Sequence, residues 1–196
     1  MIKIISGIIL AAGSSKRMGR QKLLLPFRGS TILENVIETI TTCEFIEEVL
    51  LVYEATEVID RVKGYDVKTV YNPIAEEGQS TSVIAGVKSS NPKSKAYMFI
   101  MGDQPFINKD VVERLIGIWK QNTSSIIVPR YNGKNGMPTI FSEDFKKDLL
   151  NITGDKGGRD VIKANPDKVI YVDIDENMAG FDIDTPEDYE ELLKQI

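Results

Sequence analysis

One loop near the N-terminus holds the residues best suited to chemistry, and it reads LAAGSSKRMGRQK over residues 10–22. A short apolar run precedes this N-terminal loop, so the loop follows a predicted strand. Gly13 and Gly19 permit backbone angles closed to most residues, and consecutive N–H groups in such a loop suit phosphate oxygens. Arg17 adds a planar fork of donors and Lys22 a mobile positive charge. We predict that the loop holds the triphosphate of a nucleotide; the competing interpretation is a plain turn with a solvated basic face.

A carboxylate at the end of a predicted strand is the second chemically suited group. The apolar run over residues 97–101 stops at GDQP, residues 102–105. An aspartate at the end of a buried strand is costly unless it is paired or bound to a metal ion, and ligands of open α/β sheets bind at the carboxyl ends of strands. Asp103 is therefore a candidate site residue, with a turn or cap role as the alternative. Asp182 and Asp184 lie on the same side of the chain if their stretch is extended.

These stretches together resemble a known family signature. The N-terminal loop, GDQP and the acidic stretch from Asp182 to Asp188 resemble the nucleotidyltransferases with a Rossmann-like fold, and most of all the branch that contains molybdenum cofactor cytidylyltransferase. The resemblance extends over nearly the whole chain. It implies an enzyme that transfers a nucleotidyl group from a nucleoside triphosphate to a phosphorylated small molecule, with Mg²⁺ as the cofactor and pyrophosphate as the leaving group.

The resemblance also implies roles for individual residues. Lys22 would neutralise the α-phosphate in the transition state, Arg17 would hold the β- and γ-phosphates, and Asp103 would bind Mg²⁺. Asp184 is favoured over Asp182 as the second metal ligand. The predicted nucleotide-binding residues are Leu10, Ala11, Ala12, Gly13, Ser14, Arg17, Lys22, Asn72, Gly78, Ser80 and Ser82.

The segment over residues 72–82 supports two interpretations about equally. Asn72 precedes a proline, which ends a predicted strand. Gly78 allows a tight turn, and Ser80 or Thr81 can cap a helix, so a loop followed by a capped helix explains the segment. In the resembled family a similar segment lines the nucleotide pocket, and its backbone and hydroxyls would then contact the base or the ribose.

Met137, Arg159 and Asp182 are the candidates for binding the acceptor. The resembled branch usually has Gly-His-Pro or Gly-Asn-Pro where this chain has Gly-Met-Pro at residues 136–138, so a soft apolar side chain replaces a hydrogen-bonding one. Arg159 ends a GDKGGR stretch that is similar to a family element facing the acceptor. A plain flexible loop is the alternative interpretation of that stretch.

The resemblance favours one nucleotide and one acceptor. Alanine at the position of Ala12 is associated with cytidine-using members of the family, and glycine with guanosine-using ones. We therefore expect CTP and molybdopterin as substrates, with a molybdenum hydroxylase as the recipient of the product. A sugar-phosphate or polyol-phosphate nucleotidyltransferase is the alternative enzyme. A nucleotide- or cofactor-binding chaperone without turnover is the alternative of another class, but it predicts the loss of Lys22 or of the metal carboxylates.

Composition restricts the remaining possibilities. The 196 residues suit one domain over residues 1–196, and the net charge of −5 argues against nucleic-acid binding. The chain has no histidine, which excludes Ser-His-Asp catalysis and His-ligated metals and leaves carboxylates, which prefer hard cations such as Mg²⁺. The single cysteine, Cys43, fits a reducing cytoplasm. We expect no signal peptide and no membrane span.

Strands and helices alternate along the sequence, which predicts an α/β fold with three α/β/α layers, Rossmann-like, around a mostly parallel sheet. Predicted strands cover residues 4–10, 48–53, 67–71, 97–101, 126–128 and 169–174, and Pro129 is expected to end the fifth. Predicted helices cover residues 31–40, 56–63, 81–87, 109–121, 142–152 and 185–196. Thr31 and Glu34 have the spacing of a capping box, and Pro186 suits a first helical position.

Overall fold

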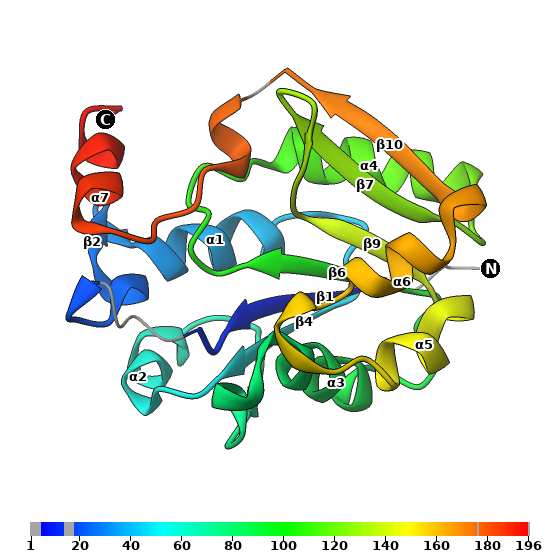
Figure 1. The fold of residues 1–196 in the computed structure, drawn as a ribbon. Helices are drawn as coiled ribbons and strands as arrows, with labels where there is room; N and C mark the ends of the chain where they lie inside the picture. The colour runs from blue at the N-terminus through cyan, green and yellow to red at the C-terminus, as the bar shows by residue number, and fades with distance from the viewer. Residues whose placement is uncertain (1–4, 14–17, 176, 196) are drawn as a thin grey trace.

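The computed structural model describes residues 5–13, 18–175 and 177–195. Ser14 and Arg17, two of the predicted nucleotide-binding residues, lie outside these ranges. A mostly parallel β-sheet forms the centre of the described chain, and helices cover both of its faces (Figure 1). This architecture confirms the predicted α/β fold with three layers.

The sheet runs in the order β10-β7-β9-β6-β1-β4-β5, and β8 pairs with β7 outside that path. Neighbours on the path are parallel, except that β9 runs antiparallel to both β6 and β7. The sheet strands are β1 (Ile5–Ala11), β4 (Glu48–Tyr53), β5 (Lys68–Tyr71), β6 (Ala96–Met101), β7 (Ile126–Tyr131), β8 (Lys134–Asn135), β9 (Thr139–Ser142) and β10 (Val169–Ile174); β2 (Pro26–Phe27) and β3 (Ser30–Thr31) form a separate hairpin. The parallel strands therefore end at one common edge, where ligands of such sheets bind.

The helices are α1 (Ile32–Thr41), α2 (Ile59–Val62), α3 (Gln79–Ser89), α4 (Lys109–Gln121), α5 (Lys146–Leu150), α6 (Arg159–Ala164) and α7 (Pro186–Leu193). The predicted capping box of Thr31 and Glu34 starts α1 with both of its hydrogen bonds. A second capping box, of Thr185 and Asp188, starts α7, and Pro186 takes its first position. Among the described residues, no helix combines the length and the apolar character needed to cross a membrane.

Alternation of side chains along β1 divides the apolar core between the two faces of the sheet. Ile5 and Ile9 face the layer that contains α1 and α4. Ile8 and Leu10 face the layer that contains α3, α5 and α6. A Cβ atom at Gly86 would lie 2.5 Å from the Ile8 side chain, so α3 packs very closely on the sheet. Both layers hold β1 firmly, and the N-terminal loop starts from this rigid strand.

A third apolar cluster packs α7 against the N-terminal loop and the chain that follows it. It consists of Met18, Leu25, Phe27, Ile32, Ile183 and Leu192. The hydroxyl of Tyr189 donates to the Pro26 carbonyl at 2.8 Å, and α7 lies beside β2 at one end of the molecule (Figure 1). Because Ile183 is fully buried, this cluster also fixes the segment that carries the two C-terminal candidate aspartates.

Leu192→Ala tests the contribution of this cluster to stability. Leu192 is fully buried, whereas its neighbour Leu193 is 45% exposed. We expect Leu192→Ala to lower the free energy of unfolding by roughly 2–4 kcal/mol, because it removes buried methyl groups and leaves a cavity. Leu193→Ala is the control and should change it by less than about 0.5 kcal/mol. Urea unfolding followed by circular dichroism measures both variants, and equal losses would contradict the role given to α7.

Three sequence-based boundaries differ from the structure. β7 continues through Pro129 instead of ending there. The backbone N–H and C=O of a strand residue point toward the same neighbouring strand. The Pro129 carbonyl accepts from the Gly136 N–H at 2.9 Å, on the side of β7 that faces away from β10. The absence of a backbone N–H at Pro129 therefore costs no hydrogen bond between β7 and β10. The predicted helices over residues 56–63 and 142–152 each divide into a 3₁₀ turn followed by a short helix, α2 or α5.

Cys43 is buried, and its thiol contacts the Thr39 carbonyl at 3.2 Å. Burial raises the pKa of Cys43 to about 11. A thiol in this environment is a poor nucleophile at neutral pH, so Cys43 is a core residue.

Candidate active site

Lys22 lies between two aspartates that are distant from it in the sequence. Its Nζ is 2.5 Å from Oδ2 of Asp103 and 2.9 Å from Oδ1 of Asp184, and Lys22 is itself buried. The fold thus brings together the N-terminal loop after β1, the end of β6 and the segment before α7. We call Lys22, Asp103 and Asp184 the charge cluster.

Backbone hydrogen bonds position Asp103. The N–H of Gly102 donates to the Leu10 carbonyl at 3.0 Å, which keeps the chain after β6 against the end of β1. A Cβ atom at Gly102 would lie 3.2 Å from that carbonyl oxygen, so the approach is close. The N–H of Ile183 donates to the Asp103 carbonyl at 3.2 Å. Asp103 is therefore tied to β1 and to the segment before α7.

The start of α7 positions Asp184, because the Asp188 carboxylate accepts from the Asp184 N–H at 3.0 Å. Burial by itself lowers the pKa of Lys22, but the charges and hydrogen bonds of Asp103 and Asp184 outweigh burial, so the pKa lies above its ordinary value. Desolvation raises the pKa of Asp182, and the nearby charge of Asp103 raises it further. Because its own pKa is raised, Lys22 carries its positive charge at neutral pH.

Asp103 keeps one oxygen for a further ligand. Its Oδ1 is buried and has no hydrogen-bond partner in the described part of the chain, although such atoms are almost always paired. No three histidine, cysteine or acidic side chains among the described residues form a metal cluster. Mg²⁺ in nucleotide enzymes needs only one or two carboxylates, since water and phosphate oxygens complete its shell. Asp103 together with Asp184 therefore fits this ion.

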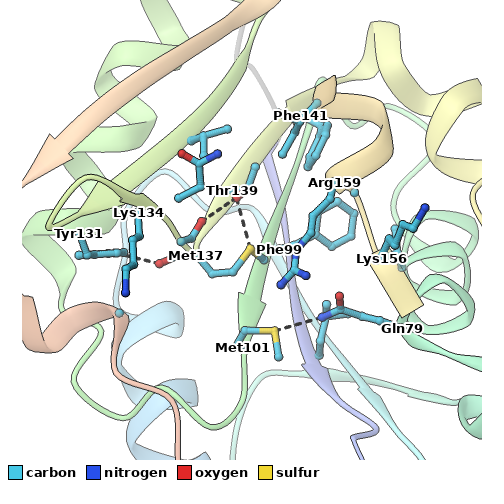
Figure 2. Close-up of a pocket in the computed structure, with 18 of the residues that line it drawn as sticks. Gln79, Phe99, Met101, Tyr131, Lys134, Met137, Thr139, Phe141, Lys156 and Arg159 are labelled. Carbon is cyan, nitrogen blue, oxygen red and sulfur yellow. Dashed lines mark hydrogen bonds between the residues drawn. The ribbon is translucent and has the colours of Figure 1, made fainter. Parts of the chain in front are cut away.

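A cavity of about 570 Å³, drawn in Figure 2, adjoins the charge cluster through Gln104, the residue after Asp103, and Asp182, which is two residues before Asp184. Gln104 and Asp182 line it, and Nε2 of Gln104 donates to Oδ1 of Asp182 at 2.7 Å. Its apolar surface includes Phe99, Met101, Val128, Met137 and Phe141, and its positive charges come from Lys134, Lys156, Arg159 and Lys163. Figure 2 shows the Arg159 side chain directed into the cavity. The cavity thus combines an aromatic floor with a cationic rim.

Met137 forms one wall of the cavity. Its thioether accepts from the Thr139 hydroxyl at 3.3 Å, and its carbonyl accepts from the Tyr131 hydroxyl at 2.8 Å. The Tyr131 ring is enclosed by backbone, because a Cβ atom at Gly136 or Gly180 would lie 2.6 or 2.5 Å from it. Tyr131 therefore joins the loop of Met137 to the segment that leads to α7. This role of Tyr131 was not predicted, because its only signals in the sequence are Gly136 and Gly180.

Internal hydrogen bonds occupy much of the segment over residues 72–82. Asn72 is buried, and its amide donates to the hydroxyls of Thr81 and Ser82 at 2.9 and 3.0 Å. Ser80 and Ser82 are buried as well, and neither they nor Asn72 line the cavity. Gly78 is the N-cap residue of α3, so the predicted cap at Ser80 or Thr81 is wrong. Nucleotide binding by this segment stays a prediction.

The turn at Gly78 packs against the loop between α5 and α6. Gly78 has a φ of +119°, and a Cβ atom there would lie 2.6 Å from the carbonyl carbon of Gly154. The N–H of Gln79 donates to Oδ1 of Asp155 at 3.2 Å, and its side chain donates to the Met101 thioether at 3.5 Å. This contact joins the predicted nucleotide segment to the GDKGGR stretch.

Apart from the segment over residues 72–82, the predicted site residues within the described ranges fall into three groups. The charge cluster contains Lys22, Asp103 and Asp184. The cavity lining contains Leu10, Met137, Arg159 and Asp182. Ala11 and Ala12 are buried at the end of β1, and Gly13 is exposed. The cavity lining also contains five residues that were not predicted from the sequence, Gln79, Gln104, Tyr131, Lys134 and Lys156. The signal for Gln104 was its position directly after Asp103 in GDQP.

Known proteins match the chain over most of its length. Residues 7–169 match the family model described as the MobA-like NTP transferase domain. The nicotine blue oxidoreductase of Paenarthrobacter nicotinovorans is 29% identical over 96% of each protein. The molybdenum cofactor cytidylyltransferase of Escherichia coli is 28% identical over 93% of this chain and 92% of that protein. Rv0371c from Mycobacterium tuberculosis superposes with a TM-score of 0.86 at 27% identity over 99% of both chains, and its manganese complex with a TM-score of 0.78 at 26% identity over 98% and 99%.

Proposed function

Because the chain belongs to the MobA-like NTP transferase family and is a nucleotidyltransferase, we propose that it transfers CMP from CTP to the phosphate of molybdopterin and releases pyrophosphate. The observation that carries the proposal is the position of Lys22, 2.5 Å from Asp103 and 2.9 Å from Asp184. Gln104 and Asp182 connect this charge cluster to a cavity large enough for a small molecule. A triphosphate and an acceptor would thus meet at the edge of the sheet.

The reaction needs alignment and charge neutralisation more than acid–base chemistry. An acceptor phosphate oxygen forms a bond to the α-phosphorus, and the bond from that phosphorus to the bridging oxygen breaks, so its electron pair leaves on pyrophosphate. A phosphate oxygen is already a nucleophile, which agrees with a chain that has no histidine. Lys22 would move from the aspartates to the α-phosphate and neutralise the charge that develops there. Arg17 would hold the departing pyrophosphate.

Asp103 and Asp184 would hold Mg²⁺, which when bound neutralises phosphate oxygens. The support in this chain is the unpartnered Oδ1 of Asp103. A complex of the related Rv0371c protein with manganese also favours a divalent ion.

The cavity supports a planar, negatively charged acceptor. Phe99 and Phe141, of which only 2% and 1% is exposed, lie at the base of the cavity beside Met137, and an apolar lining of this kind suits the heterocycle of a small molecule. Arg159 and three lysines supply positive charge for a phosphate. The preference for CTP rests on Ala12, which is buried just after β1; its methyl group would crowd a larger purine.

Pyrophosphate release tests the proposal. The purified protein is mixed with Mg²⁺, molybdopterin and each of CTP, GTP, ATP and UTP in turn, and we expect release with CTP. Release that requires a sugar phosphate or polyol phosphate instead would identify the alternative acceptor. Protection against heating by a triphosphate without pyrophosphate release would indicate a binding module. Oxidation or reduction of a substrate without pyrophosphate release would place the chain with the relative named nicotine blue oxidoreductase.

A further inference from the structure

Two consecutive residues at the end of β6 each carry a buried oxygen without a hydrogen-bond partner. These atoms are Oδ1 of Asp103 and Oε1 of Gln104, and neither has a partner within the ranges that the structure describes. Only 7% of Asp103 and 3% of Gln104 is exposed. Buried oxygens are almost always paired, so two adjacent exceptions mark a place where a ligand is expected.

Asp182 sets the orientation of the Gln104 amide. Nε2 donates to Oδ1 of Asp182 at 2.7 Å, so the amide nitrogen faces Asp182 and the amide oxygen faces elsewhere. Gln104 also lines the cavity, whereas Lys22 contacts the other carboxylate oxygen of Asp103, Oδ2. The two unpartnered oxygens thus belong to the residues that join the charge cluster to the cavity.

We propose that the amide oxygen of Gln104, together with Oδ1 of Asp103, binds the hydrated Mg²⁺ of this site. Carboxylate and amide oxygens are both partners that Mg²⁺ accepts, and the ion usually keeps several water molecules, whose hydrogens need acceptors. The identity of the ion rests on the proposed function, whereas the site rests on the two oxygens.

This role makes Gln104 the connection between the metal ion and the acceptor. One end of its amide holds the ion, and the other end holds Asp182, a candidate acceptor-binding residue in the cavity lining. The buried side chain of Gln104 would therefore fix the position of the metal-bound triphosphate relative to that of the acceptor. Such supporting groups are as important to a metal site as its direct ligands.

Binding of Mn²⁺ alone, followed by electron paramagnetic resonance of the free ion, tests the proposal without turnover. Gln104→Met keeps the size of the side chain but lacks the oxygen, and we expect it to raise the Kd for Mn²⁺ about tenfold or more. Asp103→Asn is the reference for loss of a metal ligand. Gln121→Met is the matched control, because Gln121 is exposed at the last position of α4 and does not line the cavity; its Kd should equal that of the wild type.

Gln104→Glu separates metal binding from simple support of Asp182, and it also covers the case in which Gln104→Met fails to fold. Glutamate keeps an oxygen at this position but cannot donate to Asp182. If Gln104 binds the ion, Gln104→Glu binds Mn²⁺ at least as tightly as the wild type. If Gln104 acts only through its amide nitrogen, Gln104→Glu weakens binding as much as Gln104→Met does. That second result, or an unchanged Kd in Gln104→Met, overturns the proposal.

The proposed function and this inference fail separately. Pyrophosphate release by the wild type, combined with unchanged Mn²⁺ binding in Gln104→Met, would remove only the role of Gln104. Mn²⁺ binding that depends on Gln104, without turnover of any triphosphate by the wild type, would remove the proposed function and leave the metal site in place.

Discussion

Lys22→Met is expected to lower the turnover number for pyrophosphate release by about a thousandfold, which is the effect of removing one preorganised group that stabilises transition-state charge. Methionine keeps the length of the side chain and removes the ammonium group that contacts Asp103 and Asp184. Steady-state kinetics with saturating Mg²⁺ and substrates measures the effect. A variant that keeps more than about one tenth of the wild-type rate would contradict the role of Lys22.

Two controls accompany this variant. Lys22→Arg keeps the charge but replaces a mobile point charge by a planar fork, so we expect an intermediate loss of turnover. Lys109→Met removes a half-exposed lysine whose partner is Glu113 on the surface of α4, and turnover should not change. Equal losses in all three variants would mean that the effect is not specific to the charge cluster.

Lys22→Met should also change the stability of the protein in a metal-dependent way. Loss of the ammonium group leaves the buried Asp103 carboxylate facing Asp184 without this cation, and breaking such a pair costs about 3 kcal/mol. Added Mg²⁺ should restore part of that loss, more in the variant than in the wild type. In the wild type the pKa of Lys22 is raised, so its contribution is fully present below the unfolded-state pKa of about 10.4 and is lost only as pH rises through the higher folded-state value.

Gly78→Ala is expected to lower the free energy of unfolding by about 3 kcal/mol or more, through backbone strain and overpacking together. Gly78 has a φ of +119°, and the new Cβ atom would lie 2.6 Å from the carbonyl carbon and oxygen of Gly154. Backbone atoms cannot swing aside as a side chain can. The loop that carries Arg159 would therefore move away from α3, and the KM for the acceptor should rise.

Gly133→Ala is the matched control for Gly78→Ala. Gly133 also has a positive φ, +75°, but nothing lies within 4 Å of a Cβ atom there. Gly133→Ala therefore measures the cost of a positive φ at a residue with a Cβ atom but without a steric clash, for which we expect about 1–2 kcal/mol. Urea unfolding measures stability and initial rates measure KM. Equal losses of stability in the two variants would show that the contact between Gly78 and Gly154 contributes nothing.

Local signals in the sequence were sufficient for most elements of the fold. The buried strands β1, β4 and β6 are continuous apolar runs, because helices cover both faces of the sheet. The capping box of Thr31 and Glu34 and the start of α7 at Pro186 depend on residues at most three positions apart. The predicted end of a strand at Pro129 was wrong. The cost of a proline in a strand depends on which neighbouring strand would have accepted the hydrogen bond from its N–H. That neighbour is known only from the sheet order.

The sequence by itself determined the chemistry available to this protein: a cationic loop after the first strand, an aspartate after a buried strand and no histidine to take part. Only the tertiary structure decided which groups meet. Lys22 contacts Asp184 across 162 positions of the chain, Gln104 contacts Asp182 across 78, and the Tyr131 ring lies against Gly180. Periodicity and spacing report only on near neighbours along the chain, whereas these contacts depend on the strand order of the sheet and on the docking of α7. Residue types are therefore evident in advance, but the pairing of charges and the shape of the cavity arise when distant segments pack.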